Sequence, residues 1–298
     1  MSQNEAPDFL APAATDDGVS KLTTTRQGAS DRDDTEVFPG KKGAAFTLRA
    51  VGLPGDWVEN LPKVIKLRVH WNYCWGPSYE PSVAHPPGVT FAPMIWGYYS
   101  LQGLSQQIAR IDRRRARVLL AFNEPDRKEQ ANLSVQKAQE AWPYLESLQL
   151  PLVSPSTSDP MGRWMKEFMT YVSEQNYRID YVGVHWYGGA NAKGFKTRMT
   201  SIYQLYRRPL VITEMAVADW RAKTIEDNRY SQDQVLDFMK DVLPFLEEKE
   251  WIAAYAWFPF PPDSPVGTSS ALFDREGELT QCGKFYSDWQ APKDAPRT

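Results

Sequence analysis

Residues 117–126 read RVLLAFNEPD, an apolar run that ends in Asn123 and Glu124 before a proline. Residues 209–217, PLVITEMAV, follow the same pattern and place Glu214 after the β-branched run VIT. Continuous apolar runs of this kind, bounded by turn residues, are typical of strands that are buried on both faces of a parallel sheet. Parallel strands bring the residues at their carboxyl ends to one edge. We therefore expect Glu124 and Glu214 to face the same cleft.

Six more apolar, β-branched or aromatic runs recur along the chain and predict strands. They are AAFTLRAV (44–51), VIKLRVHW (64–71), VTFAPMIWG (89–97), LPLVSPST (150–157), IDYVGVHWYG (179–188) and WIAAYAWFPF (251–260). Amphipathic stretches between the strands predict helices. They cover 133–148, with Asn132 as the N-cap, and 165–172, 195–206 and 234–246.

Eight strand–helix units over residues 44–290 give a repeat of about 31 residues, the size expected for a (β/α)8 barrel. A doubly wound open sheet is the alternative, but it would normally carry a Gly-rich phosphate loop after its first strand, and none is present. The 90 residues between Glu124 and Glu214 correspond to three units, which places the two glutamates on strands four and seven. We expect an α/β fold, a single TIM barrel domain over residues 41–290.

Residues 1–40 differ from the rest in being rich in Asp, Ser, Thr, Ala and Pro. Such a stretch cannot bury enough apolar surface to offset its ordering entropy, so we expect a flexible tail. It lacks the basic start and apolar core of a secretory signal.

The composition excludes several classes of protein. A net charge of -3 does not support a nucleic-acid-binding protein, which would normally carry a basic surface. The longest apolar run, 251–258, is far shorter than the roughly 18 residues that cross a membrane. Two cysteines exclude a disulfide-rich scaffold, although whether Cys74 and Cys282 pair stays open. With three histidines and no HExxH motif, we expect neither a metal site nor a cofactor.

Two facing carboxyl groups are the equipment for cleaving a glycosidic bond. One gives a proton to the leaving oxygen, while the other is ionised and attacks the sugar or activates water. Like charges close together cannot both ionise easily, so one of two neighbouring carboxyls keeps its proton. A single Glu after a strand is usually only a polar residue at the strand end. Glu124 and Glu214, however, each follow a continuous apolar strand and are separated by a whole number of repeat units, which favours a functional pair. His185 and Tyr187, two apart at the end of the sixth strand, lie on one side of it and can reach a carboxylate.

Aromatic residues make up 13% of the chain, with 11 tryptophans, and many of them follow predicted strand ends. The flat C–H faces of sugar rings pack on aromatic rings, so this excess fits a carbohydrate cleft. We predict substrate contacts for Trp75 after the second strand, Trp96 after the third, Trp186 on the sixth and Trp257 on the eighth. The alternative for each is packing in the core.

Several of these stretches together carry a family resemblance. In chain order they are LLAFNEPD, QANLSVQKA, DYVGVHWYG, VITEMAVADW, YAWFPF and SSALFD. They resemble glycoside hydrolase family 128, the Glyco_hydro_cc or Asl-like catalytic domain, which is found widely in fungi. The resemblance covers residues 41–289. NEP alone is common across clan A glycosidases, whereas this combination is specific.

The resemblance implies a retaining β-1,3-glucanase, active as a monomer on β-1,3-glucan without a cofactor. It assigns Glu124 as the acid/base and Glu214 as the nucleophile, and Asn123 as the residue that bonds the sugar 2-hydroxyl. His185 and Tyr187 resemble the pair that positions the carboxylates, and Trp257 the platform beneath the reacting sugar. The segment WNYCWG (71–76) departs from the family pattern, which has Asn where Cys74 stands, so one polar contact there is in doubt.

Two alternatives stay open. The first is a clan A relative that acts on another β-glucan or on mannan, which only assays on different polysaccharides separate. The second is a non-catalytic glucan-binding barrel, whose usual mark, a lost catalytic Glu, is absent. Relatives commonly act at the cell wall or outside the cell, whereas the tail shows no export signal. Endo or exo action cannot be read from the sequence, although an endo-acting enzyme is our expectation.

Overall fold

The computed structural model describes residues 37–290, in which parallel strands alternate with helices. The strands are β1 (Lys42–Ala45), β2 (Trp71–Tyr73), β3 (Thr90–Phe91), β4 (Leu119–Leu120), β5 (Leu152–Val153), β6 (Val182–Gly188), β7 (Leu210–Val217) and β8 (Ile252–Trp257). The helices are α2 (Trp57–Lys66), α3 (Leu101–Ala109), α4 (Val135–Glu146), α5 (Arg163–Glu174), α6 (Ala192–Tyr206), α7 (Gln232–Glu248) and α8 (Gln281–Asp288), with a 3-10 turn, η1, at Thr268–Ser270.

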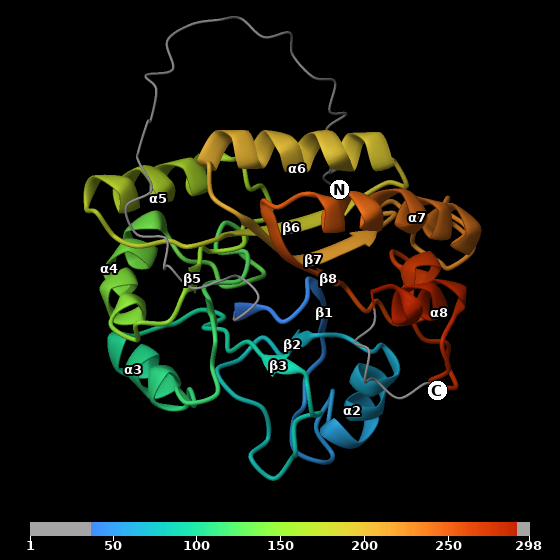
Figure 1. Ribbon diagram of the computed structural model, residues 1–298, viewed down its shortest axis with the longest axis horizontal. Helices are drawn as coiled ribbons and strands as arrows, with labels where there is room; N and C mark the ends of the chain where they lie inside the picture. The colour runs from blue at the N-terminus through green and yellow to red at the C-terminus, as the bar shows by residue number, and fades with distance from the viewer. Residues whose placement is uncertain (1–36, 291–298) are drawn as a thin grey trace, which may run out of the picture.

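The strands form a closed ring. Six of them pair in the order β3-β2-β1-β8-β7-β6, and β4 pairs with β5. Two isolated parallel bridges, Met94 to Leu120 and Val153 to Tyr181, join β3 to β4 and β5 to β6. Figure 1 shows the helices arranged around these strands. The predicted (β/α)8 barrel is confirmed.

The interior of the ring is filled by a cluster to which every strand or its flanking residue contributes. Its members are Val37, Phe38, Ala45, Trp71, Tyr73, Ala92, Met94, Val118, Leu120, Val153, Tyr181, Val211, Ala253, Ala254 and Ala256. Phe38 contacts Trp71 at the start of β2 and Tyr181 before β6, with ring centroids 5.3 and 5.9 Å away. It therefore closes the amino-terminal end of the barrel.

Because Val37 and Phe38 are buried, the folded domain begins before residue 41, where the sequence placed the boundary. The rest of the predicted tail, residues 1–36, lies outside the described residues.

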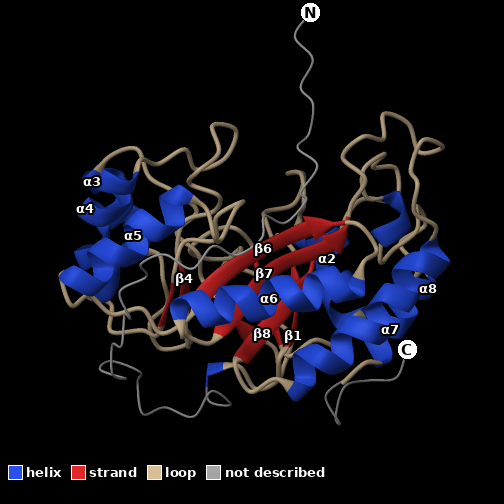
Figure 2. Cartoon of the chain, turned by 90° about the horizontal axis from the view of Figure 1, so that it is seen from above, coloured by secondary structure: helices blue, strands red, loops and turns tan. Residues whose placement is uncertain are grey.

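Outside the ring, the apolar faces of the helices cover the strands in two layers. One layer packs α6, α7 and α8 against β6, β7, β8 and β1, and the other packs α3, α4 and α5 against β4, β5 and the segment that follows β3. Figure 2 shows α6 lying along the outer side of the strands. In the described part of the chain, no helix is long and apolar enough to cross a bilayer.

The structure corrects several predicted boundaries. Residues 64–66 complete helix α2 and are not strand, because a short apolar run fits either period. The first strand is Lys42–Ala45, so only residues 44–45 of the region predicted over 44–51 are strand. Ser134 caps α4 in place of Asn132, its hydroxyl accepting from the N–H of Lys137. In the described chain, β2 and β3 are joined without a helix, and α2 and α3 were not predicted.

Candidate active site

Glu214 and His185 are direct partners in the register of β7 and β6. The register shifts between Val184 and His185, and a second irregularity lies beside Glu214 on the β7–β8 side. Such bulges redirect side chains at the rims of barrels. The alternation of β6 sends Val184 into the outer helix layer and brings His185 and Tyr187 together at the site. The prediction that these two share a side of the strand is confirmed.

Glu124 follows β4 in an unusual backbone conformation, with φ of 39°. This left-handed region is uncommon for residues other than Gly, Asn and Asp, and strain of this kind gathers at functional sites. The N–H of Glu124 donates to the carbonyl of Ser156 at 2.8 Å, and Asn123 forms a parallel bridge with the same residue. The loop after β5 thus holds the Glu124 backbone in place.

His185 lies between the two carboxyl groups. Its Nδ1 is 3.0 Å from Oε1 of Glu124 and 3.5 Å from Oε2 of Glu214. The two oxygens can therefore be no farther apart than the sum of these distances. Burial on its own lowers the pKa of His185, but the charges of Glu214 and Glu124 outweigh it, so the pKa is raised above its usual value. The structure thus brings Glu124 and Glu214 together, as the sequence predicted.

Glu214 accepts hydrogen bonds from three aromatic side chains. Its Oε1 lies 3.1 Å from the Tyr73 hydroxyl and 2.8 Å from Nε1 of Trp75, and its Oε2 accepts from the Tyr187 hydroxyl. Burial, and then the charge of Glu214, raise the pKa of Tyr73 and of Tyr187 well above the usual value. Both hydroxyls therefore keep their protons and remain donors at any pH near neutrality.

Two buried polar atoms in the site have no hydrogen-bond partner among the described residues: Oδ1 of Asn123 and Nε2 of His185. The amide nitrogen of Asn123 is fixed by Gln130, 3.2 Å away, which leaves Oδ1 free to accept. Because buried polar groups are nearly always paired, such atoms indicate where a polar ligand makes its contacts.

The predicted aromatic contacts divide into two groups. Trp75 lies in the site and donates a hydrogen bond to Glu214. Trp96 follows β3 and is half-buried between the cluster inside the ring and the layer that contains α3, α4 and α5. Trp186 points away from the site, because it occupies an outward position of β6. It stacks on Phe238, with centroids 5.2 Å apart, and meets Phe195 edge-on.

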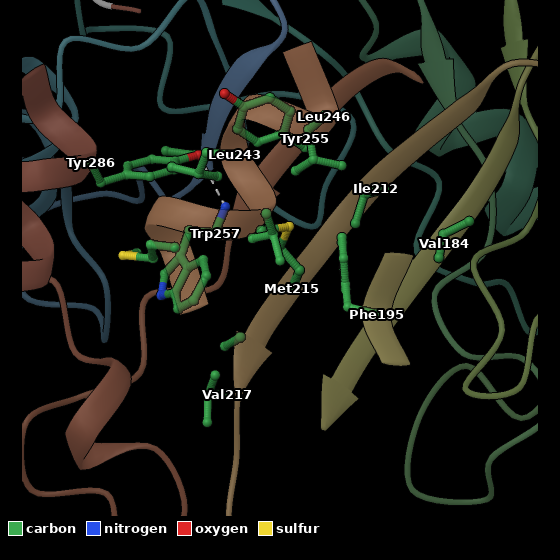
Figure 3. Close-up of a cluster of buried hydrophobic side chains, with 14 of the residues drawn as sticks. Val184, Phe195, Ile212, Met215, Val217, Leu243, Leu246, Tyr255, Trp257 and Tyr286 are labelled. Atoms are coloured by element: carbon green, nitrogen blue, oxygen red, sulfur yellow. Dashed lines mark hydrogen bonds between the residues drawn. The ribbon is translucent and has the colours of Figure 1, made fainter. Parts of the chain in front are cut away.

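The prediction for Trp257 is also corrected, because the side chain is fully buried and no sugar can reach it. Its Nε1 donates to the carbonyl of Ser270 at 3.0 Å. Figure 3 shows the indole among the buried side chains of the layer that contains α6, α7 and α8. The backbone N–H of Trp257 donates to the hydroxyl of Tyr286. The residue that reaches the site from this strand end is the next one, Phe258, which lies edge-on to Tyr187.

Three site residues were not predicted as contacts: Tyr73, Phe258 and Trp220. Trp220, in the loop after β7, is 63% exposed and its ring lies 5.8 Å from that of Tyr187. Its loop is fixed by Asp219, a buried carboxylate that accepts from Nε and Nη2 of Arg229. The guanidinium holds the pKa of Asp219 at about 2. Phe258 could not have been found by counting alternate positions, because the register of β7 and β8 shifts along the pair.

Neither cysteine forms a disulfide. Cys74 and Cys282 are buried and free, and burial raises the pKa of each thiol to about 12, so both stay protonated. The Cys74 thiol is 3.5 Å from the carbonyl of Ser78, inside its own loop. Within residues 37–290 no group of three or more His, Cys, Asp or Glu side chains is arranged to hold a metal ion.

Comparison with known families gives one match. The model of the family described as glycosyl hydrolase catalytic core matches residues 51–286. No match was found among curated proteins.

Solved structures similar to this chain include β-1,3-glucanases of glycoside hydrolase family 128. A subgroup I endo-β-1,3-glucanase from Amycolatopsis mediterranei, in complex with laminarihexaose, is 28% identical (TM-score 0.68, 83% of this chain and 98% of that one). A subgroup II endo-β-1,3-glucanase from Sorangium cellulosum is 26% identical (0.67, 86% and 100%). A subgroup V exo-β-1,3-glucanase from Cryptococcus neoformans is 25% identical (0.66, 83% and 98%). These similar structures support neither a fungal origin, which the wide occurrence of the family in fungi suggested, nor a cell-wall location.

Proposed function

The chain belongs to the glycosyl hydrolase catalytic core family, within glycoside hydrolase family 128, and on this premise we propose that it hydrolyses β-1,3-glucan with Glu124 and Glu214. The observation that carries the proposal is the contact of one His185 nitrogen with both carboxyl groups. The comparisons support it, since variants of the Amycolatopsis enzyme with either of two glutamates replaced were solved with laminari-oligosaccharides bound.

In the proposed first step, Glu214 attacks the anomeric carbon and the bond from that carbon to the leaving oxygen breaks. Glu124 gives its proton to this oxygen, and a covalent glycosyl–enzyme forms. Glu124 then takes a proton from water, which attacks the same carbon and frees Glu214. The unpaired Oδ1 of Asn123 is the acceptor that we assign to the sugar 2-hydroxyl.

The spacing of the carboxyl groups favours retention of configuration. Inverting enzymes hold their carboxyls about 6.5 to 9.5 Å apart to leave room for water, and retaining enzymes about 5 to 5.5 Å. The contacts of His185 Nδ1 limit the nearest oxygen of each carboxyl to a separation no greater than the lower edge of the inverting range. This close approach of one oxygen from each group supports the retaining arrangement that we propose.

Endo action is the second part of the proposal, since the similar structures include endo and exo enzymes. A product profile on laminarin and on reduced laminari-oligosaccharides tests it. A ladder of intermediate oligosaccharides early in the reaction supports an endo enzyme, while release of a single short product from one chain end contradicts it.

The catalytic assignment is tested by two variants. Glu214→Gln should abolish turnover and keep the fold. Glu124→Ala should still react with substrates that carry a good leaving group, and azide should restore part of its activity, giving a β-glycosyl azide. Proton NMR of the wild-type reaction should show the β-anomer first. Normal turnover of polysaccharide by either variant, or an α-anomer first, would contradict the assignment.

A further inference from the structure

The two oxygens of Glu214 are held differently, and the difference decides which one reacts. Oε1 accepts from two donors on and after β2, the hydroxyl of Tyr73 and Nε1 of Trp75. Oε2 accepts from the hydroxyl of Tyr187 and lies on the side of His185 and Glu124. Oε1 therefore has two hydrogen-bond donors, one of which, the Tyr73 hydroxyl, also lies 3.2 Å from the carbonyl of Thr213, whereas Oε2 has one donor, Tyr187, and His185 Nδ1 as a neighbour at 3.5 Å.

We propose that Trp75, together with Tyr73, is a positioning residue that holds Oε1 and thereby makes Oε2 of Glu214 the attacking atom. The proposal rests on the proposed function. In the step it describes, the bond from Oε2 to the anomeric carbon forms as the bond to the leaving oxygen breaks, and the proton of Glu124 goes to that oxygen. Oε1 becomes the carbonyl oxygen of the ester and keeps both donors throughout.

The backbone of Trp75 supports this role. Its φ is 54°, in the left-handed region that bulky side chains rarely adopt, so the surrounding structure must hold it there. The ring is wedged between Tyr73 and Phe258, with centroids 5.1 and 6.0 Å away, and Nε1 is directed at Glu214. A ring that served only as a sugar platform would need no such hydrogen bond.

The donors also favour one state of the cycle. A carboxylate accepts hydrogen bonds more strongly than an ester carbonyl, so Trp75 and Tyr73 stabilise Glu214 as the ionised nucleophile and as the leaving group of the second step. Removing a donor should therefore slow release of the glycosyl–enzyme. It should also move the acidic limb of the pH–rate profile to higher pH, because the ionised form loses support.

The test compares Trp75→Phe and Tyr73→Phe, each of which keeps a ring and removes one donor. A matched control is Trp164→Phe, since Trp164 is also half-buried and its Nε1 donates at 2.8 Å, to the carbonyl of Leu133. Because release of the glycosyl–enzyme is the step that loses support, we expect kcat on laminari-oligosaccharides to fall about 10- to 100-fold in both site variants. The acidic limb should move to higher pH in both, and the control should match the wild type.

An unchanged acidic limb with only a raised KM would overturn the proposal and leave Trp75 as a sugar platform. A readout independent of activity is the indole N–H resonance of Trp75 in a 15N-labelled protein, assigned by its loss in Trp75→Phe. It should shift on Glu214→Gln, while that of Trp164 stays in place. If the Trp75 resonance shifts but the wild type shows no glucanase activity, the proposed function is wrong and the contact between Trp75 and Glu214 stands. If the resonance does not shift, the contact itself is contradicted.

Discussion

Replacing Trp257 with alanine should destabilise the barrel and leave the chemistry of the folded enzyme nearly intact. The side chain is fully buried among Tyr286, Met215 and their neighbours, and truncating such a tryptophan costs about 3 to 5 kcal/mol. Part of that loss is the Nε1 bond, which leaves the carbonyl of Ser270 without this donor. For a domain of this size the melting temperature should fall by roughly 6 to 20 °C.

The comparison variant is Phe258→Ala at the next position, on the other side of the strand. Phe258 is half-buried and touches Trp75 and Tyr187, so we expect a smaller loss of stability and a large fall in kcat/KM. Urea unfolding followed by fluorescence gives the stabilities, and kinetics at low temperature, where both variants are folded, give the activities. A Trp257→Ala protein with wild-type stability but a much lower kcat would refute this reasoning and indicate that Trp257 contacts the sugar.

Three further outcomes follow from burial and charge. Burial lowers the pKa of Lys42 to about 7, against 10.5 for a free lysine, so between these values the unfolded chain binds more protons and the free energy of unfolding rises with pH. From pH 7 to 9 the free energy of unfolding of the wild type should rise by about 2 kcal/mol relative to that of Lys42→Met. A fall in this difference, measured by urea unfolding, would contradict the prediction. Phe38→Ala should cost about 3 to 5 kcal/mol in the same assay, whereas Tyr99→Ala, at a 95% exposed position, should change stability little. Trp220→Ala should raise KM for longer oligosaccharides at constant stability, and an unchanged KM would leave its exposed ring without a role in binding.

The closeness of Glu124 and Glu214 could be predicted from the sequence because it depends only on the repeat. Glu124 and Glu214 each follow an apolar strand, and three repeat units between them place both at the mouth of a closed ring. His185 and Tyr187 were found for a related reason, since residues two apart share a side of a strand. Position along the strand was enough for all four.

The aromatic contacts could not be predicted in the same way, because they depend on parity within a strand. Trp186 and Trp257 sit at strand ends, as the site residues do, yet both occupy outward positions and pack against helices. Parity cannot be counted across a bulge, and register shifts occur on both sides of β7. Pairing is needed to show that Phe258 faces the site and Trp257 does not.

Backbone strain separates the site from the rest of the fold more sharply than residue type does. The other non-glycine residues with positive φ have ordinary explanations. Five of them lie within a few residues of the end of a helix, where the left-handed conformation closes the last turn: Arg68, Gln149, Asn176, Arg207 and Gln290. The sixth, Asn132, is an asparagine, a residue that adopts this conformation more readily than most. Glu124 and Trp75 instead follow strands β4 and β2, where no helical turn offsets a strain of about 1 to 3 kcal/mol each. What holds them is the site: Ser156 and His185 for Glu124, and Glu214 for Trp75. Neither residue is a glycine or an asparagine, so the sequence gives no sign of the strain, and the two strained residues prove to be one carboxyl of the pair and a donor to the other.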